Sequence, residues 1–271
     1  MLFFVANVTP FDARGKLDLG QLRAHILGLA ARGVEGFVPT GSTGEFLYLT
    51  DREREAVHRT VLDAARGMPV YPCVWDPSLT TMAYLCEAAR DNGASGVMVP
   101  PPLYYRVEEP VLADWYRSFA DAAQLPVLAY HNPTYFPTPI SESLYLQLRK
   151  EGVLAGMKDS AEDLWRLKRL AAADPGGVFA GGAGVLPDVH TVPQLAGYIS
   201  ALGNAWPSLC LRSFRGEVQL RDALAERAAK VRAAGGFRAL KATLGMGCRA
   251  PFVTPSAEKM EGIPPAEAAA R

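Results

Sequence analysis

The segment PVLAYHNPTYFPTPISESLYLQLRKEGVLAGMKDS, residues 126–160, decides the class of fold. It begins and ends with short apolar runs, residues 126–130 and 154–160, and an amphipathic stretch after Ser141 lies between them. A serine in this place is a common helix N-cap, because its hydroxyl accepts a hydrogen bond from a free N–H group of the first turn. Strand, helix and strand in this order predict a right-handed unit with two parallel strands.

The same alternation continues in both directions along the chain. Further apolar runs have the length and composition of strands at residues 5–11, 36–40, 69–75, 96–101, 178–182 and 197–200. Helical stretches separate them, and Thr50 and Ser78 are placed to cap two of these. The stretch between residues 182 and 197 is poorly patterned, because Pro187 and Pro193 interrupt it. Eight strands alternating with helices predict an α/β fold, a (β/α)8 TIM barrel.

The strand-like runs stop after residue 208. Residues 209–234 and 237–244 predict additional helices, and residues 262–271 predict a frayed tail. We therefore expect a catalytic barrel over residues 1–207 and a C-terminal helical extension over 208–271, packed together as one structural unit. The chain length of 271 residues agrees with the ~250 residues typical of such barrels.

Composition excludes several classes of protein. Lys plus Arg and Asp plus Glu both total 28, and no basic stripe is present, which argues against a nucleic-acid partner. The four scattered cysteines form no CxxC pair, as expected for free thiols in a reducing cytoplasm. No run approaches the ~20 apolar residues of a membrane span, and the amino terminus lacks a basic signal-peptide region. We expect a cytoplasmic protein with no membrane partner.

Reactive side chains collect where strands are expected to end, which is where barrel enzymes carry their active sites. Lys158 lies near the end of the run 154–160, and the strand alternation puts it on one face with Gly156, which should leave room for a ligand. Burial destabilises an ammonium group, and the neutral amine can attack a carbonyl carbon. Lys158 is thus either a nucleophile or a salt-bridged lysine at the barrel rim. The other lysines are expected in turns, on helix surfaces or in the tail: Lys16, Lys150, Lys168, Lys230, Lys241 and Lys259.

Tyr130 ends the preceding strand, and neighbouring strands lie ~4.8 Å apart, so its phenol can share a pocket with Lys158. It could transfer a proton there or serve only in packing. His131 points the other way, which favours packing. The GSTGE segment, residues 41–45, offers hydroxyls and backbone amides that could bind a carboxylate. No histidine has the spacing of a metal ligand, so no metal is expected.

Six motifs together resemble those of the dihydrodipicolinate synthase and N-acetylneuraminate lyase family. They are VTPFDARGKLD (8–18), GSTGE (41–45), PPLYY (101–105), AYHNP (129–133), GMKDS (156–160) and GYISALGNAWP (197–207). The resemblance covers roughly residues 5–207. It implies that Lys158 forms a Schiff base with pyruvate or a similar 2-oxo acid, with no other cofactor. It also implies that Tyr130 shuttles protons, and that Ser42 and Thr43 bind the carboxylate and relay protons.

The resemblance extends to the assembly and to further pocket residues. Tyr104 corresponds to a relay tyrosine that the family reaches across a subunit interface, which implies a homotetramer built as a dimer of dimers, or a homodimer. Gly182 and Ile199 fall where backbone groups of the family line the pocket.

One departure concerns the second substrate. The synthase branch continues its tyrosine strand as Y-N-x-P-x-R-T-G, and the arginine binds the carboxylate of aspartate semialdehyde. Here Tyr135 occupies the arginine's place, and a phenol cannot replace a bidentate guanidinium. The Y-x-N-P form resembles a branch that cleaves or hydrates arylidene pyruvates, so an apolar or aromatic second pocket with Tyr135 and Phe136 is expected.

Three functions remain open on the sequence. The first is an aldolase or lyase that joins pyruvate to an aldehyde, or cleaves a 2-oxo acid to these products, with an aldehyde other than aspartate semialdehyde. The second is a 4-hydroxy-tetrahydrodipicolinate (dihydrodipicolinate) synthase that uses another cation, for which Arg106 is the nearest candidate. The third is a non-catalytic oxo-acid binding protein, which would not require a buried amine.

Overall fold

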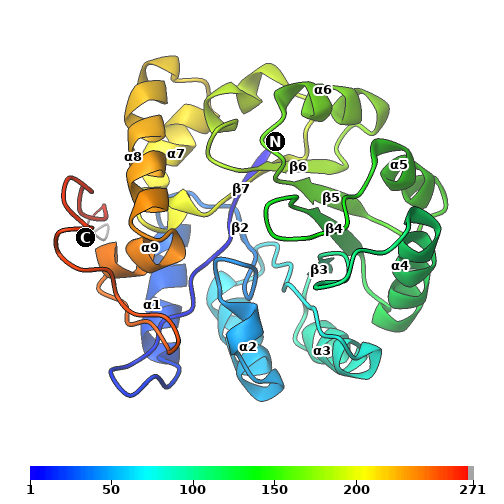
Figure 1. The fold of residues 1–271 in the computed structure, drawn as a ribbon, viewed down its shortest axis with the longest axis horizontal. Coiled ribbons are helices and arrows are strands. Elements are labelled where there is room, and N and C mark those ends of the chain that lie inside the picture. The colour runs from blue at the N-terminus through cyan, green and yellow to red at the C-terminus, as the bar shows by residue number, and fades with distance from the viewer. Residues whose placement is uncertain (268–271) are drawn as a thin grey trace.

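The computed structural model describes residues 1–267, and within them seven strands form one parallel sheet in the order β2-β1-β7-β6-β5-β4-β3. The strands are β1 (Leu2–Val5), β2 (Gly36–Phe37), β3 (Val97–Val99), β4 (Val127–His131), β5 (Gly156–Asp159), β6 (Val178–Gly181) and β7 (Gly197–Ser200). The sheet is curled, and helices surround it (Figure 1). The prediction of an α/β fold with a parallel sheet is confirmed.

The segment of residues 69–74 connects the two edges of this sheet. Val70 forms a parallel bridge to Phe37 of β2, and Cys73 forms one to Met98 of β3. The sequence predicts a regular strand here, but the segment makes only isolated bridges. Pro69 and Pro72 explain the difference, because neither residue has an N–H group to donate to a neighbouring strand.

The first strand is shifted relative to the prediction. The expected strand over residues 5–11 is wrong, since β1 spans Leu2–Val5. Beyond Ala6 the backbone leaves the sheet: the N–H of Val8 donates to Asn204 Oδ1 at 3.1 Å, and Pro10 has no N–H. Side-chain hydrogen bonding therefore replaces strand pairing at this end of β1.

The helices around the sheet follow the predicted rhythm. They are α1 (Leu19–Ala30), α2 (Asp51–Ala65), α3 (Leu79–Asp91), α4 (Glu109–Ala123), α5 (Glu142–Lys150) and α6 (Leu164–Ala173). The predicted caps Thr50, Ser78 and Ser141 each accept a hydrogen bond from the first turn of their helix. Between β6 and β7 the chain forms only a short 3-10 helix, Leu186–Thr191. No helix of residues 1–267 is long and apolar enough to cross a membrane.

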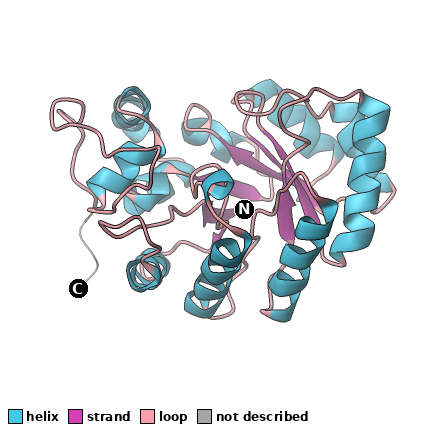
Figure 2. Cartoon of the chain, turned by 60° about the horizontal axis from the view of Figure 1, so that its bottom comes forward, coloured by secondary structure: helices cyan, strands magenta, loops and turns pink. Residues whose placement is uncertain are grey.

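The C-terminal part forms α7 (Pro207–Phe214), α8 (Arg221–Ala233) and α9 (Phe237–Thr243), which lie on one side of the sheet (Figures 1 and 2). The single helix expected over residues 209–234 is wrong, because Gly216 takes a left-handed conformation with φ +97° and ends α7. The expected fraying is wrong as far as Glu267, whose carboxylate accepts hydrogen bonds from the N–H groups of Ser208 (2.8 Å) and Leu209 (3.0 Å). Residues 268–271 lie outside the described residues.

Side chains fill the inside of the curled sheet. Residues from several strands and from the loops that follow them form this inner cluster: Phe4, Ala6, Val38, Cys73, Met98, Leu128, Tyr130, Phe136, Phe179 and Ile199. Tyr130 lies at its carboxyl-end boundary, where β4 gives way to a loop. The inner cluster thus forms the floor beneath the residues that the sequence singles out for chemistry.

Candidate active site

Tyr130 and Lys158 lie opposite each other on paired strands. They are register partners in the ladder between β4 and β5. The amine of Lys158 lies 4.4 Å from the centre of the Tyr130 ring. Only 6% of Lys158 and 4% of Tyr130 are exposed. No ion pair joins Lys158 to a carboxylate in the described part of the chain, and the carboxylate of the adjacent Asp159 pairs with Arg166.

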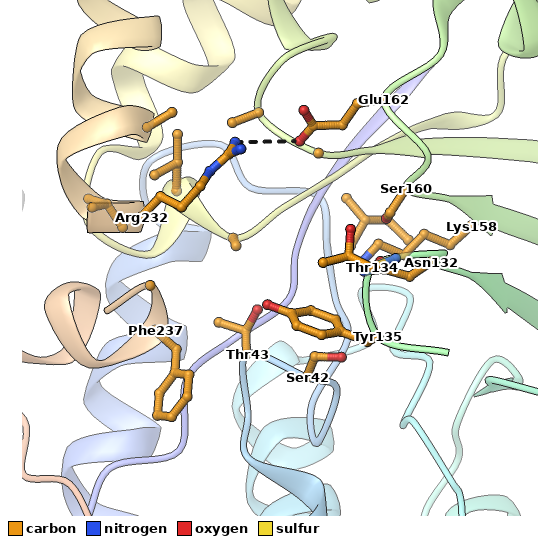
Figure 3. A pocket seen from close by; sticks show the side chains of 18 of the residues that line it. Ser42, Thr43, Asn132, Thr134, Tyr135, Lys158, Ser160, Glu162, Arg232 and Phe237 are labelled. Carbon is orange, nitrogen blue, oxygen red and sulfur yellow. Dashed lines mark hydrogen bonds and ion pairs between the residues drawn. The ribbon is translucent and has the colours of Figure 1, made fainter. Parts of the chain in front are cut away.

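A cavity of about 430 Å³ opens above this pair at the carboxyl ends of the strands. Seven residues singled out from the sequence line it: Ser42, Thr43, Tyr130, Tyr135, Lys158, Gly182 and Ile199. Figure 3 shows Lys158, Asn132 and Ser160 on the strand side of the cavity, with Arg232 and Phe237 entering from the C-terminal helices. The structure therefore gathers segments that are far apart in sequence around one buried amine.

Tyr104 is one of the residues singled out from the sequence that the structure does not bring to this cavity. Its side chain is 85% exposed, and its ring meets that of Tyr105 edge-on at 4.7 Å. Its φ of +74° is strained for a residue with a side chain. Arg106, the candidate second cation, is also exposed and outside the cavity lining. Of the described residues that line the cavity, only Lys158 and Arg232 carry a positive charge.

A glycine on β6 makes the space for the Lys158 side chain. A Cβ atom at Gly181 would lie 2.9 Å from Lys158 Cε and 2.4 Å from Ser160 Oγ. The expectation that Gly156 leaves room for a ligand is wrong, because a Cβ there would lie 2.4 Å from the carbonyl oxygen of Gly177. Gly156 is thus required by the close approach of a neighbouring strand.

The environment of Tyr130 leaves its phenolic proton available. Its hydroxyl oxygen accepts a hydrogen bond from Asn132 Nδ2 at 3.0 Å. Phe136 packs edge-on against the ring at 5.2 Å and belongs to the inner cluster. The expectation that Phe136 lines a second aromatic pocket is therefore wrong, whereas Tyr135, 64% exposed, does face the cavity.

His131 and Asp159 hold the ends of β4 and β5 together on the opposite face. His131 Nδ1 accepts from the N–H of Ile140 at 3.2 Å, and Asp159 binds Arg166 at 2.6 Å. Burial lowers the pKa of His131, so the ring is neutral at physiological pH. These contacts agree with the packing role expected for His131.

The GSTGE loop is braced at its start by a buried histidine of α2. His58 Nε2 lies 2.7 Å from Thr40 Oγ1, which in turn lies 2.9 Å from the carbonyl oxygen of Cys73. Burial lowers the pKa of His58 to about 3, so the neutral ring can donate to Thr40. Further along this loop, the buried hydroxyl of Ser42 has no hydrogen-bond partner among residues 1–267. An unpaired buried hydroxyl is costly, which suits a group that awaits a ligand.

The same loop is held at its far end by a buried ion pair. Glu45 Oε1 lies 2.5 Å from the Nζ of Lys241, on α9, and both side chains are fully buried. The expectation that Lys241 lies on a helix surface is therefore wrong. Sequence reasoning also missed that Arg232, Phe237 and Leu240 of the C-terminal helices line the cavity. The sequence feature that could have indicated a buried, functional C-terminal helix is the lysine within the largely apolar run FRALKATL, residues 237–244.

A second ion pair lies at the cavity wall opposite the strands. Arg232 Nη2 lies 4.0 Å from Glu162 Oε1, and the two side chains approach from opposite sides (Figure 3). Gly182 makes room for this carboxylate, since a Cβ there would lie 2.3 Å from Glu162 Cγ. The carbonyl oxygen of Gly182 accepts from the hydroxyl of Tyr198 at 2.7 Å.

Residues 2–232 match the model of the Dihydrodipicolinate synthetase family, and the chain belongs to this family. This family and the strand-end cavity define the protein as a lyase of the aldolase class. The resemblance found in the sequence is thereby confirmed.

Curated relatives include both lyases and aldolases. A probable mitochondrial 4-hydroxy-2-oxoglutarate aldolase of Emericella nidulans is 30% identical, covering 96% of this chain and 91% of that protein. A 4-hydroxy-tetrahydrodipicolinate synthase of Methanospirillum hungatei is 34% identical over 75% of this chain and 72% of its own length. Among solved structures, a candidate dihydrodipicolinate synthetase from Pseudomonas aeruginosa superposes with a TM-score of 0.87 at 27% identity, covering 97% of each chain. The wild-type sialic acid aldolase of Ruminococcus gnavus, 21% identical, shares the fold with a TM-score of 0.87 over 96% of this chain and 93% of its own.

The space beside Lys158 gives a direct test of the site. Gly181→Ala should lower turnover by ~10²-fold, because the new methyl group would displace the Lys158 side chain by a fraction of an ångström or more. Gly28→Ala, on α1, is the control: its Cβ would meet nothing closer than 3.6 Å. Steady-state lyase activity of folded protein is the measurement, and full activity of Gly181→Ala would contradict the role of this glycine.

Proposed function

We propose that the protein is a Schiff-base-dependent aldolase or lyase that joins pyruvate to an aldehyde, or cleaves a 2-oxo acid to pyruvate and an aldehyde. The observation that supports this most is the buried amine of Lys158, which faces a cavity and has no carboxylate partner in residues 1–267. A salt-bridged rim lysine would have such a partner. A binding protein without catalysis would have no use for an unpaired buried amine beside a phenol.

In the proposed reaction, Lys158 Nζ attacks C2 of pyruvate and the resulting carbinolamine loses water to give an imine. Tyr130 supplies the proton that leaves with the hydroxyl group and later accepts one back. Tyr130 then accepts a proton from C3 to give an enamine, whose carbon attacks the aldehyde, and Tyr130 returns this proton to the new alkoxide oxygen. Cleavage is the reverse, and water finally adds to the imine and releases the free lysine and the 2-oxo acid. Asn132 supports this role by donating to the Tyr130 oxygen, which leaves the phenolic hydrogen directed to the ligand.

The carboxylate of the 2-oxo acid would bind at the GSTGE loop. The unpaired hydroxyl of Ser42 and the side chain of Thr43 both line the cavity that contains Lys158. Backbone groups at Gly182 and Ile199 would contact the same substrate from β6 and β7. Two hydroxyl donors and loop amides suit a carboxylate, since hydrogen bonds to a charged acceptor are the stronger ones.

We further propose a homotetramer or homodimer in which Tyr104 reaches the cavity of a neighbouring subunit. Its exposure and strained backbone support this, because such strain persists where contacts outside the segment select it. For the fold we propose that residues 69–74 count as a barrel strand, which gives a (β/α)8 barrel over residues 1–207 with the helical extension 208–271.

The second substrate, in this proposal, is an aldehyde other than aspartate semialdehyde. Tyr135 faces the cavity where the synthase branch has an arginine, and Arg106 lies outside the lining. The alternative, a 4-hydroxy-tetrahydrodipicolinate synthase, is favoured by relatives that carry that name at 30–35% identity. In that case Arg232 would have to bind the carboxylate, since it is the remaining cation of the described lining.

Borohydride trapping tests the reaction class. Pyruvate plus borohydride should add one stable adduct, located on Lys158 by peptide mass spectrometry, and Lys158→Ala should abolish both the adduct and turnover. Lys241 is an internal control, because it is also a buried lysine but is paired with Glu45. An adduct on Lys241, or full activity of Lys158→Ala, would overturn the assignment.

Removing one phenolic oxygen tests the proton shuttle. Tyr130→Phe should still trap pyruvate but turn over ~10²–10⁴-fold more slowly, the usual contribution of a positioned acid–base group. Tyr116→Phe is the matched control, because Tyr116 is a fully buried tyrosine outside the cavity lining. Steady-state rates of the two variants are compared at saturating substrate, and near-normal turnover of Tyr130→Phe contradicts the shuttle role.

Tyr135→Arg tests the choice of aldehyde. Relative kcat/KM should shift towards aspartate semialdehyde and away from uncharged aromatic or polyhydroxylated aldehydes by roughly ten- to a hundredfold, the effect of a charge-assisted hydrogen bond. Tyr84→Arg, on an exposed tyrosine of α3 outside the cavity lining, should leave the ratio unchanged. Efficient use of aspartate semialdehyde by the wild-type protein would instead support the synthase.

A further inference from the structure

We propose that the buried Glu45–Lys241 ion pair positions Ser42 and Thr43 for the carboxylate of the 2-oxo acid, which makes Lys241 of α9 a positioning residue for the first substrate. The inference rests on the proposed function and adds a residue to it. Lys241 lies beyond residues 2–232, the part of the chain that matches the family model. The C-terminal extension would then be part of the substrate site and not only its outer wall.

Stability alone does not account for this pair. Both side chains are fully buried, and the amine of Lys241 also lies 4.4 Å from the centre of the Phe11 ring. Removing two charges from water is costly, and a well-packed apolar pair is often as stable or more stable in such a place. Glu45 Oε2 has, in addition, no partner among the residues described. We therefore infer that the short, directional contact between Glu45 and Lys241 serves to fix the position of the loop that carries Glu45.

The geometry that it fixes is that of the GSTGE loop. Glu45 has φ +60° and Thr40 has φ +54°, so the loop starts and ends in the left-handed region that side chains disfavour. Thr40 is held by His58, and Glu45 is held by Lys241. Ser42 and Thr43 lie between these two anchors. Without the ion pair, the strained end of the loop would relax and its hydroxyls would leave the orientation suited to a carboxylate.

Helix α9 itself connects this anchor to the cavity. Phe237 and Leu240 line the cavity, and Lys241 follows Leu240 directly in the chain. The segment after α9 is fixed as well, because Arg249 lies 4.3 Å from the centre of the Phe11 ring and binds Glu53 of α2 at 2.5 Å. Two cations of the C-terminal segment thus hold Phe11 and the GSTGE loop in one arrangement.

The test measures pyruvate binding separately from chemistry. The rate of borohydride trapping on Lys158 is followed against pyruvate concentration, well below the temperature at which any variant unfolds. Lys241→Met should raise the half-saturating pyruvate concentration by about tenfold or more, with the maximal trapping rate within about threefold of wild type. Glu45→Gln keeps the size and an acceptor oxygen, so it should shift the same concentration less, by about three- to tenfold.

Two controls separate positioning from loss of stability. Arg149→Met breaks the Arg149–Asp174 pair, 2.7 Å long and outside the cavity lining, and should lower the melting temperature without changing pyruvate affinity. In a Ser42→Ala/Thr43→Val background, Lys241→Met should cost less than about threefold in affinity, because the groups it positions are gone. If Lys241→Met does not fold, Glu45→Gln in the same two backgrounds gives the measurement.

The outcomes distinguish the two proposals. Wild-type affinity for pyruvate in Lys241→Met and Glu45→Gln, or equal losses with and without the two hydroxyls, would overturn the positioning role while trapping on Lys158 still stood. Failure of the wild-type protein to trap pyruvate on Lys158 would instead overturn the proposed function.

Discussion

The hydrogen-bonded ladder between β4 and β5 sets Tyr130 directly opposite Lys158, and the candidate chemistry depends on this register. A slip of β5 by one residue against β4 would turn Lys158 away from Tyr130, to the other face of the sheet where Asp159 now lies. The contacts of His131 with Ile140 and of Asp159 with Arg166 hold the register from the outer face. The inner face is thereby left to an amine, a phenol and the glycine of β6 that makes room for them.

The cavity is a composite of segments with different roles. Strand ends supply the reactive groups, the GSTGE loop supplies hydroxyls, and the C-terminal helices supply the outer wall with Arg232, Phe237 and Leu240. Rigid strands place the amine, whereas loop and helices depend on long-range ion pairs for their position. Such a division would let the residues of the outer wall change without moving the reactive groups at the strand ends.

Local patterns in the sequence predict much of this structure. The strand–helix rhythm, the caps at Thr50, Ser78 and Ser141, and the meeting of Tyr130 with Lys158 all follow from periodicities within a few dozen residues. The failures concern contacts between distant segments. Nothing near Lys241 in the chain shows that Glu45 lies against it, and nothing near Phe136 shows that its ring fills space beneath Tyr130. Likewise, the extent of β1 is set by Asn204, almost two hundred residues away.

The pairing of residues 69–74 with the sheet has two gaps, at Pro69 and Pro72, which donate no hydrogen bond. The other backbone groups of this segment still pair with both neighbours: Tyr71 N–H donates to Phe37 of β2, and Val74 N–H donates to Met98 of β3. Slow backbone-amide exchange with solvent reports how often each part of a protein opens locally, and sparse pairing permits opening without global unfolding. Deuterium should therefore enter the amides of this segment sooner than those of β4 and β5. The GSTGE loop is linked to this segment, because Thr40 Oγ1 donates a hydrogen bond to the carbonyl oxygen of Cys73. Local opening of residues 69–74 would therefore displace the candidate carboxylate-binding loop before it displaced Lys158.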